Sequence, residues 1–249
     1  MAVAALYDIH GNLPALEAVL DDVRRADVDR IVVGGDVLPG PMPRETLERL
    51  LTLDLPVQFI HGNGDRVVLA QMAGQDISEV PEQHRDVIRW TARQLDAAHQ
   101  RVLARWPATW RVAIRGIGDV LFCHATPRND TEIFTRVTPD DRLVTIFDAV
   151  NAAAVICGHT HMQFDRAIGR TRVVNAGSVG MPFAGPPGAY WLLLGPGVEL
   201  RRTDYDFANA AERLRATAFP RVEGLAVRYV LQPPLETDMI EAFTKTELQ

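Results

Sequence analysis

Seven side chains of metal-ligand type follow short apolar segments in five separate parts of this chain. They are Asp8, His10, Asp36, Asn63, His124, His159 and His161. Carboxylate, amide and imidazole ligands together suit Mn, Fe, Co, Ni or Zn better than Ca or Mg alone. Seven ligands also exceed what one tetrahedral zinc ion uses. We therefore expect two divalent metal ions, about 3.5–4 Å apart, that share one carboxylate.

Asp36 is the residue that we assign to the shared position. It follows the β-branched run 31–33, which is typical of a strand buried on both faces. Gly34 and Gly35 remove side chains where this strand ends, so that backbone can approach a ligand closely. The proline-rich stretch 39–43 then prevents regular structure. This pattern places Asp36 at the carboxyl end of a strand, where open α/β sheets bind ligands.

The other candidate ligands also come directly after expected strands. These strands cover residues 1–6, 31–33, 55–60, 120–122 and 152–156. Asp8 and His10 are two residues apart, so an extended backbone places both side chains on one side. Asn12 can either cap the helix that follows or donate a hydrogen bond to a phosphate oxygen of a substrate. Because all five segments share the strand-end position, together they fit one two-metal site.

The rest of the chain is expected to alternate between helices and strands. Helices are expected over 13–23, 43–53, 138–151, 204–217 and 235–249, with a polar helical insert near 66–105. Further strands are expected over 110–115 and 227–231, and another is expected to end near residue 175. Residues 190–194 and 198–202 are expected to form a hairpin. Thr138 is the expected cap of its helix. Repeated strand–helix–strand order favours a largely parallel sheet and, taken alone, a single doubly wound one.

Three further histidines are not expected to bind metal. His84 and His99 lie in the polar helical segment without a partner at ligand spacing, so we expect them at the surface or at an interface. His61 is expected on a turn that faces solvent, with donation of a proton to a leaving group as the alternative.

Length and composition restrict the class of protein. The chain has 249 residues and no internal repeat or low-complexity linker, so one domain over 1–249 is the simplest prediction. A formal net charge of −6 argues against general nucleic-acid binding. Its two cysteines lie in apolar runs without a C-x-x-C pattern, as in reduced cytosolic proteins. We find no signal peptide and no membrane span, and therefore expect a cytoplasmic protein. A homo-oligomer is left open.

Five segments resemble the five motifs of the calcineurin-like metallophosphoesterases. They are 8–12 (DIHGN), 35–36 (GD), 62–65 (GNGD), 123–124 (CH) and 158–161 (GHTH). The resemblance extends over about residues 6–180 in the family's order. It is strongest to the small prokaryotic phosphodiesterase branch that includes the YfcE-like proteins and some dinucleoside polyphosphate hydrolases.

This resemblance implies a fold and a set of roles. The fold is an α/β (α+β) four-layer αββα sandwich of two mixed β-sheets flanked by helices, in place of a single doubly wound sheet. One metal ion would be held by Asp8, His10, Asp36 and His161. The other would be held by Asp36, Asn63, His124 and His159. Among these, Asp36, Asn63 and His124 are predicted to be catalytic, and Asn12 is predicted to bind substrate. Mn is the first expectation for both ions, with Fe, Zn, Ni, Co or Mg as alternatives.

Two positions depart from the family's pattern. Gly64 stands where the family often has a histidine that contacts phosphate and assists the leaving group, so Asp65 lacks that histidine as a partner. The residues after Asp36 also lack the arginine of the serine/threonine protein phosphatase branch. This second departure disfavours phosphoprotein substrates.

The resulting hypothesis is a phosphoesterase that hydrolyses phosphodiester or phosphomonoester bonds through a hydroxide shared by two metal ions. The substrate would be a nucleotide-type or other small phosphate ester. Without a histidine at Gly64, aryl or pyrophosphate-type esters should react better than alkyl esters, because an alkoxide needs about 10²–10⁴-fold help from a general acid. The alternatives are a protein phosphatase-like activity and a catalytically weak, metal-dependent sensor or scaffold.

Overall fold

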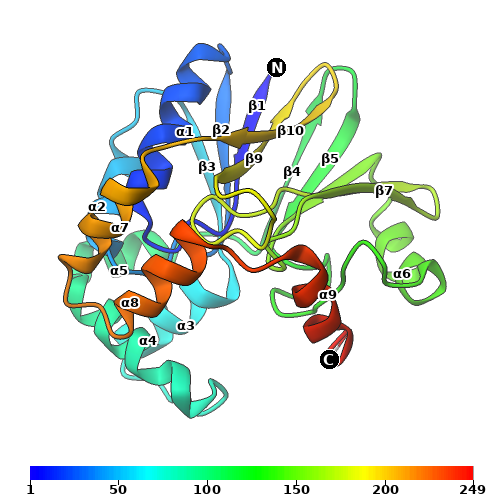
Figure 1. Ribbon diagram of the computed structural model, residues 1–249. Helices are drawn as coiled ribbons and strands as arrows, with labels where there is room; N and C mark the ends of the chain where they lie inside the picture. The colour runs from blue at the N-terminus through cyan, green and yellow to red at the C-terminus, as the bar shows by residue number, and fades with distance from the viewer. Residues whose placement is uncertain (249) are drawn as a thin grey trace.

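Two five-stranded sheets form the centre of the protein, as the computed structural model of residues 1–248 shows (Figure 1). The first sheet has the order β10–β9–β1–β2–β3. Its strands are β1 (Val3–Leu6), β2 (Arg30–Gly34), β3 (Val57–Ile60), β9 (Ala189–Leu194) and β10 (Val198–Thr203). Strands β1, β2 and β3 are parallel, whereas β9 and β10 are antiparallel to their neighbours. The sheet is therefore mixed.

The second sheet has the order β4–β5–β6–β8–β7. Its strands are β4 (Thr109–Ile114), β5 (Gly118–Cys123), β6 (Ala154–Cys157), β7 (Phe164–Ile168) and β8 (Thr171–Asn175). Strands β5, β6 and β8 are parallel, and the two edge strands are antiparallel to them. Two mixed sheets are thus confirmed, and the single doubly wound sheet suggested by strand order alone is wrong.

The alternation of side chains along β1 explains why two sheets pack together. Ala4 and Leu6 point toward the helices outside the first sheet, whereas Val3, Ala5 and Tyr7 point toward the second sheet. All five residues are completely buried. A strand that is apolar on both faces needs a layer on each side. The Tyr7 hydroxyl, which lies between the sheets, donates a hydrogen bond of 3.0 Å to the Ile156 carbonyl.

Helices cover the outer face of the first sheet (Figure 1). They include α1 (Leu13–Arg25) and α2 (Pro43–Leu51), together with α3 (Asn63–Met72), α4 (Glu82–Gln94) and α5 (Ala97–Leu103). Helix α7 (Phe207–Arg215) lies outside α1 and packs against the C-terminal helical segment. Helix α1 buries Leu16, Val19 and Leu20 at helical spacing against this sheet. Helices α3 to α5 are the expected insert near 66–105, and α3 begins three residues earlier.

The outer face of the second sheet is covered by α6 (Asp140–Phe147) and the short 3-10 turn Asp148–Val150. Leu143 and Phe147 pack there against Val155 and Val173 of the sheet. This completes the αββα arrangement. Helix α9 (Glu236–Thr244) lies on this side near the C-terminus, and residue 249 of its expected range is outside the described residues (Figure 1).

Three local predictions differ from the structure. Pro139 occupies the cap position of α6, and Thr138 instead donates its hydroxyl hydrogen to Glu247. The expected strand over 227–231 is wrong, because α8 (Val222–Leu225) continues into the π-helical turn Ala226–Leu231. Ala226 and Val230 pack against α7, which requires a helical period rather than alternation. Strand β7 was not expected because polar residues separate its two buried ends.

No helix among residues 1–248 is long and apolar enough to cross a lipid bilayer.

Candidate metal centre

The carboxyl ends of five parallel strands bring the candidate ligands to one end of the sandwich. The first sheet provides Asp8, His10, Asp36 and Asn63, and the second sheet provides His124, His159 and His161. Asn63 is the first residue of α3 rather than part of a loop. The site therefore forms only when both sheets are packed together.

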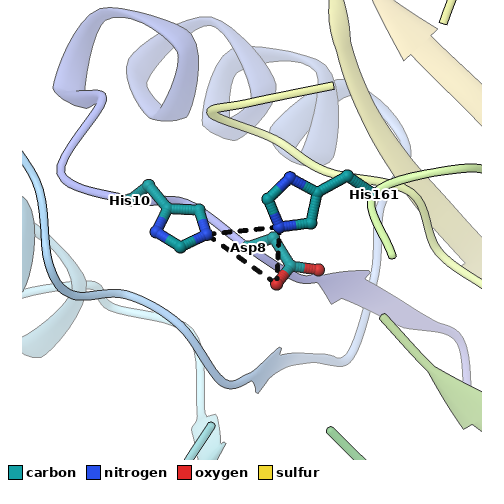
Figure 2. Close-up of side chains that lie close together, drawn as sticks. All are labelled: Asp8, His10 and His161. Carbon is teal, nitrogen blue, oxygen red and sulfur yellow. Dashed lines mark hydrogen bonds and ion pairs between the residues drawn. The ribbon is translucent and has the colours of Figure 1, made fainter. Parts of the chain in front are cut away.

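Asp8, His10 and His161 form one compact group, and Figure 2 shows the three side chains turned toward one another. His161 Nε2 lies 3.3 Å from Asp8 Oδ1 and 3.3 Å from His10 Nε2. His10 Nε2 lies 4.0 Å from the same Asp8 oxygen. All three residues are buried. Three atoms of ligand type at this spacing can hold one divalent cation.

A second group consists of Asp8, Asp36 and His124. His124 Nε2 lies 3.8 Å from Asp8 Oδ1 and 3.6 Å from Asp36 Oδ1. The other oxygen of Asp36 lies 3.7 Å from His10 Nε2 in the first group. One carboxylate thus faces a histidine in each group, which is the geometry that a bridging ligand requires. Asp8 Oδ1 also belongs to both groups.

Three buried polar atoms of this centre have no hydrogen-bond partner in the described part of the chain: Asp8 Oδ1, Asn63 Oδ1 and His124 Nε2. Leaving a buried polar atom unpaired costs about 1–3 kcal/mol. Each is the kind of atom that coordinates a divalent cation. The residues present therefore fit a metal centre, because bound cations would satisfy all three atoms.

Backbone carbonyls orient three of the histidines. The Nδ1 atoms of His10, His124 and His161 lie 3.3, 3.0 and 2.7 Å from the carbonyl oxygens of Pro39, Gly34 and Met181. Donation from Nδ1 fixes the tautomer and leaves Nε2 free to bind metal. His159 is arranged in the opposite way, since its Nε2 lies 3.2 Å from the Thr131 carbonyl oxygen. Its Nδ1 is therefore the nitrogen that remains available.

The backbone is left-handed at five of the seven candidate ligands. The φ angles are 53° at Asp8, 47° at His10, 50° at Asp36, 67° at His159 and 58° at His161. Such a conformation costs about 1–3 kcal/mol per non-glycine residue and is concentrated at functional sites. Hydrogen bonds across the site hold it in place, including 3.0 Å from His10 N to Asp36 O and 2.7 Å from Ser178 Oγ to Asp8 O.

Burial and neighbouring charges set the protonation of the centre. Burial, together with His161, lowers the pKa of His10 to about 3, and burial with His124 lowers the pKa of His159 to about 3. Both imidazoles are therefore neutral near pH 7, as metal binding requires. Burial opposes ionisation of Asp8, but the imidazoles led by His161 hold its pKa below the usual range. Burial and the Asp8 carboxylate raise the pKa of Asp36.

Asn12 is buried and makes the contacts of a helix cap. Its Oδ1 accepts a 3.2 Å hydrogen bond from Ala15 N, and its Nδ2 donates one of 3.0 Å to the Gly180 carbonyl. Both polar ends of the side chain are thus engaged within the protein. The substrate-binding role of Asn12 stays a prediction that these contacts do not support.

Gly64 packs too closely against its surroundings to accept a side chain. A Cβ atom there would lie 2.3 Å from the Leu38 carbonyl oxygen and 3.0 Å from Asp36 Oδ1. Asp65 is buried and accepts hydrogen bonds of 3.0 Å from both Leu38 N and Gly62 N. Asp65 therefore binds the backbone on both sides of the site, and these hydrogen bonds replace the contact with a histidine that the family's pattern would provide.

Arg66 and Asp130 border the centre, and the sequence analysis did not identify either. Arg66 Nε and Nη2 lie 2.8 and 3.1 Å from the two oxygens of Asp130, and Nη1 lies 3.0 Å from Glu79 Oε1. His61 Nδ1 is 3.6 Å from Asp130 Oδ2, and this carboxylate raises the pKa of His61. His61 is half-buried and lines a surface cavity together with Arg66 and Asp130. The position of Arg66 directly after the 62–65 motif was the available signal.

The two other histidines differ from each other. His84 is exposed, as expected, whereas His99 is buried and lies 2.8 Å from Asp96, which caps α5. The expectation for His99 was wrong because its ring is buried against the first turn of α5, where Nδ1 accepts a hydrogen bond from the backbone nitrogen of Asp96.

A cavity of about 540 Å³, here called the insert cavity, opens beside the candidate ligands. His10, Asp36 and Asn63 line its inner side, and its outer wall is largely apolar. That wall includes Pro39, Val67, Val80, Val87 and Ile88. The volume lies within the roughly 300–1,000 Å³ typical of ligand pockets.

Comparison with known proteins agrees with this fold. Residues 1–194 match the model of the calcineurin-like phosphoesterase superfamily domain. An uncharacterized protein from Methanocaldococcus jannaschii is 27% identical over 238 residues, covering 88% of this chain and 93% of that protein. The crystal structure of a hypothetical protein from Pyrococcus horikoshii OT3 is similar with a TM-score of 0.78 at 22% identity, covering 92% of this chain and 98% of that one. The crystal structure of a metallophosphoesterase from Sphaerobacter thermophilus is similar with a TM-score of 0.70 at 27% identity, covering 92% of this chain and 97% of that one.

Proposed function

Because the chain belongs to the calcineurin-like phosphoesterase superfamily, we propose that it hydrolyses phosphate esters with two divalent metal ions, Mn in the first instance. Fe, Zn, Ni, Co and Mg are the alternatives. The observation that carries this proposal is the set of unpaired buried atoms on Asp8, Asn63 and His124. Buried polar atoms without a hydrogen-bond partner are rare in folded proteins, and a bound ion is one of the explanations for them.

The chain would hold the two ions through both sheets. Asp8, His10, Asp36 and His161 would hold one ion, and Asp36, Asn63, His124 and His159 the other. When bound, such ions lower the pKa of water to near 7 and neutralise charge on phosphate oxygens. Asp36 would keep the two ions together, since its oxygens face His10 and His124. Backbone carbonyls would keep the imidazoles aimed at the centre.

The surroundings of the centre favour a small phosphodiester or phosphomonoester, including nucleotide-type esters. The insert cavity offers an apolar wall for one substituent, and Gly64 offers no proton donor to the leaving oxygen. A leaving group that is stable as an anion departs without such help. We therefore expect aryl and pyrophosphate-type esters to react faster than alkyl phosphates.

A substrate panel tests this proposal. Purified protein with Mn²⁺ is assayed on 4-nitrophenyl phosphate, bis(4-nitrophenyl) phosphate, a dinucleoside polyphosphate, a cyclic nucleotide, glycerol phosphate and a phosphopeptide. Turnover of the small aryl or anhydride substrates, abolished by EDTA and restored by Mn²⁺, is the expected result. Equal rates on glycerol phosphate and the aryl ester would contradict the inference drawn from Gly64.

A metal-dependent sensor or scaffold is the second candidate, and Gly64 is the observation that favours it. The Leu38 carbonyl excludes a histidine side chain there, so the centre lacks the family's frequent proton donor. Metal binding without turnover on any substrate of the panel would support this candidate. Turnover limited to the phosphopeptide would instead support a protein phosphatase-like activity.

A further inference from the structure

A second cavity, of about 330 Å³, adjoins the metal centre on the side of the C-terminal helices. We call it the C-terminal cavity. It shares His10, Pro39, His84 and Val87 with the insert cavity, so the two spaces meet at a candidate metal ligand. Its other wall includes Met181, Phe219, Arg221, Leu225, Arg228 and Tyr229. Residues 219–229 lie beyond the 1–194 range that matches the family model.

The C-terminal segment is firmly attached at this place. Phe219 packs edge-on against Trp90 of α4, with ring centroids 5.3 Å apart. Arg221 Nη2 lies 3.1 Å from Asp86 Oδ2, also on α4. Helix α8 and the π-helical turn therefore form a wall built on the helical insert, near α4 in Figure 1. The C-terminal cavity is a product of this packing.

Aromatic rings connect the C-terminal cavity to the metal centre. His161 stacks on Phe183 with ring centroids 4.7 Å apart and an interplanar angle of 29°. The Phe183 ring lies 6.0 Å from the ring of Tyr229. Tyr229 is therefore two ring contacts away from the candidate metal ligand His161. Aromatic side chains that line a cavity are typical binding surfaces for nucleobases.

The two cavities differ in available positive charge. In the insert cavity, Arg66 is paired with both Asp130 and Glu79. In the C-terminal cavity, Arg221 is paired with Asp86, but Arg228 makes no ion pair with residues 1–248. The Arg228 guanidinium is exposed and lies 5.7 Å from the centroid of the Tyr229 ring. A guanidinium without a carboxylate partner, next to a ring, suits a phosphate attached to a base.

We infer that the C-terminal cavity binds a nucleoside-phosphate part of the substrate, with a phosphate at Arg228 and the base against Tyr229. The scissile phosphate would lie at the metal centre, and the substituent on its other side would enter the insert cavity. The substrate class is thus a two-armed phosphate ester or anhydride in which one arm is a nucleotide. This inference rests on the proposed function, and it goes further by assigning Arg228 and Tyr229 to specificity.

Binding can be measured apart from catalysis. ADP is titrated calorimetrically into wild-type protein, Arg228→Gln, Arg228→Lys and Tyr229→Leu, after EDTA treatment and again with Mn²⁺. Because hydrogen bonds to charged groups are the stronger ones, Arg228→Gln should raise the ADP dissociation constant about tenfold or more in both conditions. The ADP dissociation constant of Arg228→Lys should lie between those of wild type and Arg228→Gln, since lysine keeps the charge but lacks the planar guanidinium group. Exposed Arg115, on the β4–β5 turn, gives the matched control Arg115→Gln.

Pyrophosphate and adenosine, titrated separately, distinguish the two halves of the site. Arg228→Gln should weaken pyrophosphate binding and Tyr229→Leu should weaken adenosine binding, each with little effect on the other probe. Equal ADP affinity of wild type and Arg228→Gln would overturn the inference, as would no ADP binding by wild-type protein. In either case, turnover of bis(4-nitrophenyl) phosphate would leave the proposed function standing.

The reverse result is also distinguishable. ADP binding that depends on Arg228, without turnover of any ester, would uphold the C-terminal cavity and contradict the proposed hydrolase function. Where turnover occurs, Arg228→Gln should raise KM for a dinucleoside polyphosphate about tenfold while leaving KM for 4-nitrophenyl phosphate unchanged.

Discussion

The backbone nitrogen of Gly64 donates a hydrogen bond of 2.8 Å to Oδ1 of Asp36. This contact ties the start of α3 to the carboxylate that faces both groups of candidate ligands. A side chain at Gly64 would crowd this contact, because a Cβ atom would lie 3.0 Å from the same oxygen and only 2.3 Å from the Leu38 carbonyl oxygen. A glycine here is therefore a requirement of the packing as well as a departure from the family's pattern.

Restoring a side chain at Gly64 should damage the protein. We expect Gly64→Ala and Gly64→His to reduce the free energy of unfolding by about 1–3 kcal/mol, as overpacking commonly does. Urea denaturation monitored by circular dichroism measures this. Gly185→Ala is the control, since a Cβ atom at Gly185 would meet nothing within 4 Å. Increased activity of Gly64→His at unchanged stability would show that the position is open.

Replacing Asp36 should affect both metal ions together. Asp36→Asn removes the charge of the residue that faces His10 and His124, so metal affinity should fall by more than the roughly 10–100-fold typical of losing a ligand's partner. Metal content by inductively coupled plasma mass spectrometry, after dialysis against Mn²⁺, is the measurement. Exposed Asp54 provides the control Asp54→Asn. Full occupancy in Asp36→Asn would remove the bridging assignment.

Metal binding should stabilise the fold. Bound cations would give partners to the atoms of Asp8, Asn63 and His124 that have none in the described part of the chain. Free Mn²⁺ at 100 times its dissociation constant should add about 2.7 kcal/mol per site to the free energy of unfolding. Thermal denaturation with EDTA and with graded Mn²⁺ tests this, and a His124→Ala variant should respond less. A melting temperature that is insensitive to every divalent metal would contradict the presence of a metal centre.

Acid should destabilise the metal-free protein partly through His159. Burial lowers its pKa to about 3 from 6.5, so between these values the unfolded chain binds more protons than the folded one. The stability that the neutral ring contributes is therefore lost as pH falls from about 6.5 toward 3. His159→Gln should lose less stability than wild type between pH 7 and pH 5 in urea denaturation. His84→Gln, at an exposed position, should behave like wild type.

The Asp65 carboxyl group affects the pH dependence of stability in the opposite direction. Burial and Asp36 raise its pKa to about 7 from 3.8, so its contribution to stability is lost as pH rises through that range. The comparison between His159→Gln and wild type removes this effect, because both proteins carry Asp65. Identical pH dependence in the two proteins would show that His159 binds protons equally in the folded and unfolded states, which would contradict a lowered pKa in the folded protein.

Tyr7 should contribute to stability through its hydroxyl group. The hydroxyl donates to the Ile156 carbonyl of the other sheet, and the ring is completely buried. Tyr7→Phe should therefore cost about 0.5–1.5 kcal/mol of unfolding free energy. Tyr229→Phe is the control, since the Tyr229 hydroxyl makes no hydrogen bond with residues 1–248. A neutral Tyr7→Phe substitution would show that the bond between the sheets adds no net stability.

Local sequence patterns predicted the strand ends well, because the glycine-rich turns that follow β2 and β3 are marked by residue type alone. Strand order did not predict two sheets. Sheet assignment depends on which apolar faces meet, and the alternation in β1 is invisible in a run where every residue is apolar. The segment 227–231 failed for a related reason: nearly all of its residues are apolar, so the sequence does not show that Ala226 and Val230, four residues apart, form the buried helical face against α7.

The seven candidate ligands could be selected from the sequence because each follows a short apolar segment. Arg66 and Asp130 could not be paired, since 64 residues separate them and neither charge is unusual on its own helix or loop. The restriction on Gly64 was equally hidden. It arises from the Leu38 carbonyl, which reaches the glycine only through the tertiary fold.

The candidate ligands are divided between two sheets, and this division affects how the molecule would respond to strain. A small rotation of one sheet against the other would move His124 and His161 relative to Asp8 and Asp36, and it would strain the hydrogen bond between His124 and the Gly34 carbonyl. Volume changes in the core between the sheets, for example at Phe122 or Leu192, should therefore alter catalytic rate as well as melting temperature. Residues in the core between the sheets could therefore influence the candidate metal centre without touching it, because they set the angle between the two sheets.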